Sequence, residues 1–161
     1  MEIVDSSMRP VDRWFSSYGA DHQNHTNQWI HVFCVPLIFW SIMVMLWCIP
    51  VPGTWFRTGT WAALSMFGLW MFYWRLSKPL AFGALLFFMA ISWSSRWLYP
   101  QLGARSFLLM GIIVFVLAWI GQFIGHKIEG RKPSFFTDLT YLLIGPLWVL
   151  AKLYKKLGLP Y

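Results

Sequence analysis

The chain has 161 residues, of which 58% are hydrophobic and only 12% are charged, and its mean hydropathy is +0.53. A soluble domain of this length does not need so much apolar surface to build its core, so we expect an integral membrane protein. The formal net charge of +7 is typical of a protein that meets anionic lipid headgroups. The basic residues punctuate the loops and form no nucleic-acid-binding module, so we expect membrane lipid and no nucleic acid as a partner.

Apolar stretches alternate with turn signals along the chain. Four stretches are near the roughly 17 to 25 residues that a helix needs to cross a bilayer, although the second is short: 29–49, 60–74, 80–98 and 107–125. Proline, glycine and serine separate them at 50–53, 77–79 and 100–103. Short connections of this kind imply antiparallel neighbours. The sequence therefore predicts an all-α bundle of four transmembrane helices.

A fifth apolar stretch, 139–153, contains Gly145 and Pro146 and is interrupted by Lys152. If it stays on the side of the N-terminus, that side collects ten of the 13 Lys and Arg residues, and by the positive-inside tendency it is cytoplasmic. We therefore expect a C-terminal interfacial or half-inserted helix, with both termini in the cytoplasm. The expected organisation is one membrane-embedded domain over 1–161: a polar segment (1–28), four spans (29–126), and a basic loop with the C-terminal helix (127–161).

The chain contains four histidines, and all of them lie near the start of the first predicted span or at the end of the fourth: His22, His25, His31 and His126. An even number of spans separates the two groups, so both lie on the cytoplasmic side and can meet. His22 and His31 are nine residues apart, which on one continuous helix puts them on roughly opposite faces. For both to reach one site, the chain must bend between them.

Other polar side chains share helix faces with these histidines. Asn27 lies four residues before His31, and Gln122 and Glu129 flank His126 at spacings of four and three. Lipid contact does not select such a stripe of amide, imidazole and carboxylate groups at a helix end. Asn27 and Gln122 could orient the imidazoles, or they could join neighbouring helices by hydrogen bonds.

Neutral imidazoles are good ligands of iron, zinc, copper and nickel. A site made of histidines, with or without one carboxylate, leaves coordination positions open for dioxygen or a substrate. His22, His31 and His126, with or without Glu129, would suffice for such a site. The alternative interpretation is that these are ordinary interfacial side chains, with Glu129 in a solvated surface cluster beside Arg131.

Three other classes of protein can be compared with a mononuclear metal enzyme. A bis-histidine haem protein would need two facing imidazoles, and a non-catalytic membrane scaffold would use the histidines as polar contacts between helices. Histidine-box desaturases are disfavoured, because their di-iron sites need about eight histidines and this chain has four. No serine, cysteine or paired-carboxylate arrangement indicates hydrolysis.

Two spaced sets of residues resemble the Mpo1-like family, and the likeness covers most of the chain. The first set is Tyr18, His22, Asn27, His31 and Pro36. The second set is Trp119, Gln122, Gly125, His126, Glu129 and Pro133. The closing run DLTYLLIGPLWVLAKL, residues 138–153, is similar to bacterial members, which favours a bacterial inner membrane.

The resemblance implies an iron(II)-dependent dioxygenase of fatty-acid α-oxidation, which uses dioxygen to convert a 2-hydroxy fatty acid into the acid one carbon shorter. It also implies that His22, His31 and His126 are the metal ligands, with Glu129 as a further catalytic candidate. His25 stands where we expect proline in many relatives, so it could be an extra ligand, a contact to the substrate carboxylate or an incidental residue. Lys127 and Arg131 are further candidates for attracting that carboxylate.

Overall fold

The computed structural model describes residues 8–20, 22–130 and 135–161, including their side chains except those of 135–140. These residues form five helices and no strand, which confirms the all-α prediction for the part of the chain described. The helices are α1 (Pro10–Ala20), α2 (His25–Cys48), α3 (Thr60–Leu76), α4 (Lys78–Glu129) and α5 (Phe135–Lys156). Helix α1 lies inside the segment that we had expected only to be polar.

Helix α2 begins four residues before the predicted start of the first span. Asn24 is its N-cap, and the Asn24 side chain accepts hydrogen bonds from the backbone N–H groups of Thr26 (2.9 Å) and Asn27 (3.3 Å). A side chain that satisfies otherwise unpaired N–H groups stabilises the first turn of a helix. The early start places Asn27 and His31 in the first two turns of α2, on a regular helix.

The predicted third and fourth spans are two halves of one long helix, α4. The break expected at 100–103 is confirmed at Gly103, where the backbone leaves the helical conformation (φ 74°, ψ 160°) and α4 is kinked. Glycine adopts this positive φ without a steric clash, so a single residue is enough to bend the helix. The break at Ser77 is confirmed: its hydroxyl caps α4 by accepting a hydrogen bond from the Leu80 N–H (3.5 Å), with Pro79 in the first turn.

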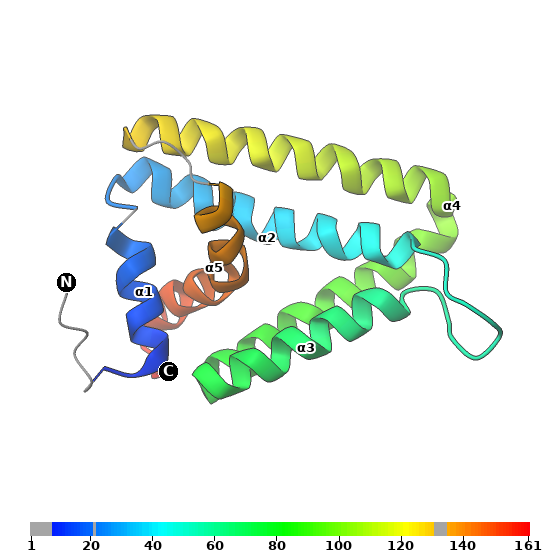
Figure 1. Cartoon of the computed structure of the whole chain (residues 1–161), viewed down its shortest axis with the longest axis horizontal. Helices are drawn as coiled ribbons and strands as arrows, with labels where there is room; N and C mark the ends of the chain where they lie inside the picture. The colour runs from blue at the N-terminus through cyan, green and yellow to red at the C-terminus, as the bar shows by residue number, and fades with distance from the viewer. Residues whose placement is uncertain (1–7, 21, 131–134) are drawn as a thin grey trace.

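Figure 1 shows α2 running beside the returning half of α4, while α3 runs beside the first half of α4. The bend in α4 therefore brings its C-terminal end back to the start of α2. Helices α1 and α5 pack at this same end of the molecule. The prediction that His31 and His126 lie at one end of the bundle is confirmed.

Among the described residues, two helices, α2 and α4, are long and apolar enough to cross a membrane by length and composition. The sequence predicted four separate spans, whereas only these two helices meet the criteria among the described residues. One of these two helices is 52 residues long and bent, and α3 has only 17 residues. The fifth apolar stretch forms α5, which is held by side-chain contacts to the other helices. Tyr73 donates a hydrogen bond to the Leu143 carbonyl (2.6 Å), and Tyr154 donates one to the Pro79 carbonyl (2.9 Å).

Glycines allow α2 and α4 to approach closely. A Cβ atom at Gly111 would lie 2.7 Å from a methyl group of Val44, and one at Gly121 would lie 2.7 Å from the Cys34 sulfur. A Cβ atom at Gly125 would overlap the side-chain oxygen of Asn27. Small residues at a helix contact, here including Gly121 and Gly125 four residues apart, let two apolar helices pack closely and gain dispersion contacts.

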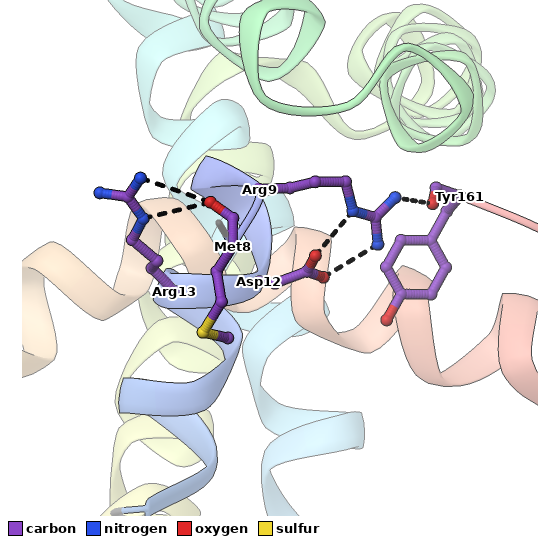
Figure 2. A network of polar contacts seen from close by, with 5 residues as sticks. All are labelled: Met8, Arg9, Asp12, Arg13 and Tyr161. Atoms are coloured by element: carbon purple, nitrogen blue, oxygen red, sulfur yellow. Dashed lines mark hydrogen bonds and ion pairs between the residues drawn. The ribbon is translucent and has the colours of Figure 1, made fainter. Parts of the chain in front are cut away.

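Helix α1 is fastened to the C-terminal residue of the chain by the polar network in Figure 2. Arg9 forms an ion pair with Asp12 (2.6 Å) and donates a hydrogen bond to the main-chain oxygen of Tyr161. The edge of the Phe15 ring also packs against the Tyr161 ring, with centroids 6.0 Å apart. These contacts hold α1 against the segment that follows α5, and α1 in turn carries Tyr18 toward the end of the bundle where α2 begins.

The close approach of α2 and α4 predicts that Gly125→Ala destabilises the protein. Asn27 cannot swing away easily, because it is completely buried and its amide is hydrogen bonded to Glu129. Overpacking of this kind costs about 1–3 kcal/mol. The melting temperature Tm should fall, whereas Gly68→Ala, where a Cβ atom would meet open space, should leave Tm unchanged or raise it. Equal Tm values for the two variants would contradict the packing argument.

Candidate metal centre

Three imidazole rings meet at the end of the bundle where α2 begins. His22 lies between α1 and α2, His31 lies in the second turn of α2, and His126 lies in the last turn of α4. The ring centroids are 4.3 Å apart for His22 and His31, 5.1 Å for His31 and His126, and 5.7 Å for His22 and His126. All three side chains are buried, with 2%, 2% and 7% of their surface exposed in chain order.

The chain bends between His22 and His31, as predicted. Helix α1 ends at Ala20 and α2 begins at His25, so the two histidines do not share one helical axis. The His22 ring stacks on the Tyr18 ring, with centroids 4.1 Å apart and planes 8° from parallel. Tyr18 is itself buried and packs on Trp148 of α5 (4.7 Å between centroids). Helices α1 and α5 therefore fix the position of His22.

Backbone carbonyl groups orient two of the rings. The Nδ1 atom of His22 lies 2.6 Å from the Tyr18 carbonyl oxygen, and the Nδ1 atom of His31 lies 3.0 Å from the Asn27 carbonyl oxygen. A carbonyl oxygen only accepts hydrogen bonds, so each Nδ1 carries the hydrogen and each Nε2 of the neutral ring keeps a lone pair. Metal-binding histidines are commonly held in this way by a hydrogen bond from the second ring nitrogen.

The arrangement fits a single divalent transition-metal ion. One nitrogen atom from each of the three histidines can be chosen so that all of them lie within 4.8 Å of one another. Imidazole nitrogens bound to one ion at about 2.1 Å are separated by roughly 3–4 Å, so only small shifts are needed to bind it. Beside the rings is a cavity of about 20 Å³, which is enough for one water molecule or one small ligand. The buried side chain of Gln122, one turn before His126, also lines this cavity.

Glu129 lies close to these histidines, but it is outside the group of three. Its carboxylate accepts hydrogen bonds from the backbone N–H groups of Gln23 (2.7 Å) and Asn24 (3.0 Å) and from the side-chain amide of Asn27 (2.8 Å). A carboxylate at the N-terminus of a helix satisfies unpaired donors and interacts favourably with the helix dipole. Glu129 therefore joins the end of α4 to the start of α2.

The other candidates from the sequence have different surroundings. Asn27 is completely buried and connects Glu129 with His31, through its side chain and its carbonyl group respectively. His25 is exposed, and its Nε2 accepts a hydrogen bond from the Trp29 indole N–H (3.3 Å). Lys127 is exposed in the last turn of α4. Arg131 lies outside the described residues.

Sequence reasoning did not identify the contribution of α5 to this centre. Trp148 lies 6.1 Å from His22 between ring centroids, and Lys152 stands 3.9 Å above the Trp148 ring. Gln28 of α2 also accepts a hydrogen bond from Lys152 (2.7 Å). The interruption of an apolar stretch by Lys152 was a visible signal, but its partner is 124 residues away in the chain, and only the fold brings the two together.

Comparison with known proteins gives a match to a family model. No similar chain is found among curated proteins or among solved structures. A family model described as 2-hydroxy-palmitic acid dioxygenase Mpo1-like matches residues 8–157. This range contains His22, His31 and His126 and the helices α1 to α5. Because the match extends over nearly the whole chain, this protein belongs to the Mpo1-like family.

Proposed function

We propose that this protein is an iron(II)-dependent dioxygenase that shortens 2-hydroxy fatty acids by one carbon. The observation that carries the proposal is the buried group of three histidines, whose nitrogen atoms lie within 4.8 Å of one another although the residues come from three separate segments. The family description supplies the reaction class and points to a fatty-acid substrate. His22, His31 and His126 would hold the iron.

The stoichiometry of this reaction needs no external reductant. One 2-hydroxy acid and one dioxygen molecule give the shorter acid, carbon dioxide and water, so the substrate itself supplies the electrons. Bound iron(II) would bring the substrate and dioxygen together and provide the redox-active centre.

The residues of the chain supply a fixed and sheltered site for this chemistry. The carbonyl groups of Tyr18 and Asn27 hold two imidazoles through Nδ1, the Tyr18 ring stacks on His22, and the tilted Trp148 ring lies beside them. Shielding by these rings limits the access of bulk water, which would compete for open coordination positions. The three nitrogen ligands leave those positions available for substrate and dioxygen.

We further propose that the helices are embedded in a membrane, the bacterial inner membrane, with the histidine end at the cytoplasmic surface and α5 in the interface. In the most apolar 18-residue stretch of each helix, only 39% of α2 and 22% of α4 is buried inside the structure. A core helix of a soluble protein would be mostly buried. The second half of α4 exposes large apolar side chains: Leu109, Ile113, Leu117, Ile120 and Ile124. Because the two halves of α4 run in opposite directions and α3 pairs with the first, this arrangement corresponds to four membrane segments.

The alternatives are less compatible with the site. A haem needs an open slot between its two axial ligands, whereas the cavity beside the three imidazoles measures only about 20 Å³. A non-catalytic scaffold would bind no metal stoichiometrically. Metal content therefore separates the scaffold from the dioxygenase.

The first prediction concerns metal content. Protein purified in detergent without oxygen and supplied with iron(II) should hold about one iron per chain, and His31→Ala and His126→Ala should each lower that content about tenfold or more, because each removes one of only three ligands. His25→Ala is the matched control and should keep the iron, because His25 is exposed and lies outside the group. Elemental analysis measures all four proteins. Iron that is absent from the parent, or unchanged in both ligand variants, would refute the proposed site.

The second prediction concerns the reaction. The iron-loaded protein should consume dioxygen with 2-hydroxypalmitate and release the acid with 15 carbons, while palmitate, which lacks the hydroxyl group, should give no product. His126→Ala should reduce the rate by about 100-fold or more, because dioxygen is not activated without the metal. An oxygen electrode and mass spectrometry of the product measure the two quantities. Equal turnover of palmitate would contradict the proposed substrate class.

The third prediction separates a structural role of Glu129 from metal ligation. Glu129→Gln removes the negative charge that accepts hydrogen bonds from the start of α2, at a cost of about 1.5–3 kcal/mol, so Tm should fall while the iron content stays near that of the parent. Lys127→Gln, two residues earlier and exposed, should change neither quantity. Loss of iron from Glu129→Gln without a fall in Tm would instead identify Glu129 as a ligand.

A further inference from the structure

A groove separate from the cavity at the histidines lies between the start of α2 and the end of α5. Its volume is about 480 Å³, within the range of small-molecule sites. Its walls are partly apolar, formed by Trp29, Val32, Val149 and Leu153. Its polar lining comes from His25, Gln28, Lys152 and Lys156, and within the described part of the chain no carboxylate lines it. The groove therefore combines an apolar wall with two ammonium groups.

Lys152 is the most constrained cation of this groove. Its ammonium group is half-buried, donates a hydrogen bond to the Gln28 side chain (2.7 Å) and stands 3.9 Å above the Trp148 ring. Burial, with a smaller contribution from the charge of Lys155, lowers the pKa of the Lys152 ammonium group. A cation that is partly removed from water, and whose contacts are an amide oxygen and an indole ring, gains when an anion binds beside it.

The groove adjoins the candidate metal centre. The side-chain amide nitrogen of Gln28, whose oxygen accepts from Lys152, donates a hydrogen bond to the His22 carbonyl (2.7 Å). Trp148 contacts Lys152 and lies 6.1 Å from the His22 ring. The cavity beside the histidines, at about 20 Å³, is far too small for an acyl chain. A long-chain substrate therefore needs a second place to rest near the histidines.

We propose that this groove binds a long-chain fatty acid, with its carboxylate on Lys152 and Lys156 and its acyl chain along Trp29, Val32 and Leu153. The charge and apolar lining of the groove support an anionic amphiphile, and the choice of a fatty acid rests on the proposed function. A single acyl chain with one carboxylate matches a groove that combines two ammonium groups with apolar side chains from α2 and α5. The groove would thus hold the substrate near the iron and does not itself contain a metal ligand.

Direct binding of radiolabelled palmitate tests this proposal without turnover. The protein, in nanodiscs of zwitterionic lipid, should bind palmitate saturably both with iron and after treatment with a chelator. The double variant Lys152→Gln/Lys156→Gln should bind it about tenfold or more weakly, because two charge-assisted contacts are lost. Lys152→Arg, which keeps the charge, should recover most of the affinity. Lys155→Gln is the matched control: it removes one charge from the same helix turn outside the groove and should bind palmitate like the parent.

Competition identifies the ligand. Methyl palmitate, which has the same chain without the charge, should not displace palmitate, and phosphatidylglycerol should displace it only weakly. Unchanged affinity in the double variant, or displacement by either competitor at the same concentration as unlabelled palmitate, would overturn the proposal. Iron content of the same samples tests the proposed function separately. Iron uptake without lysine-dependent palmitate binding would refute only this groove, and palmitate binding without iron uptake would refute only the metal centre.

Discussion

The structure depends on the close contact between the start of α2 and the end of α4. Gly121 and Gly125 let the two helices approach until side chains of α2 touch the backbone of α4. The Glu129 carboxylate then joins the backbone N–H groups at the start of α2, so the same two helix ends are held by apolar packing and by hydrogen bonds. Because His31 and His126 lie within a turn or two of these contacts, the distance between their rings follows from the helix crossing.

The remaining helices complete the site around this pair. Helix α1 places Tyr18 against His22, and α5 adds Trp148, whose ring lies near both of them. The network that fastens Arg9 to Tyr161 keeps α1 against the segment after α5. The third histidine therefore depends on contacts between the two ends of the chain, whereas the other two depend on the central helix pair.

Much of the fold was accessible from the pattern of apolar stretches and turn residues. Segment lengths and turn residues predict the all-α class and the breaks after α2 and at Ser77. The even number of predicted spans between His31 and His126 places these two residues at the same end. The break expected at 100–103 is also present, but turn residues do not reveal how many of them leave the helix, and here only Gly103 does. Helix α1 was missed because its stabilising partners lie near the far end of the chain, where local sequence gives no sign of them.

The sequence by itself determined the chemistry available to this protein: a strongly apolar chain, a small set of histidines, and spacings that require a bend between His22 and His31. Only the tertiary structure decided which of those groups meet. It gathered three histidines from separate segments, turned Glu129 toward the backbone of α2, and set Lys152 beside Gln28. The physical reason is that residue type and periodicity are local properties, whereas these contacts join side chains about a hundred residues apart, whose distances depend on how the helices cross and bend.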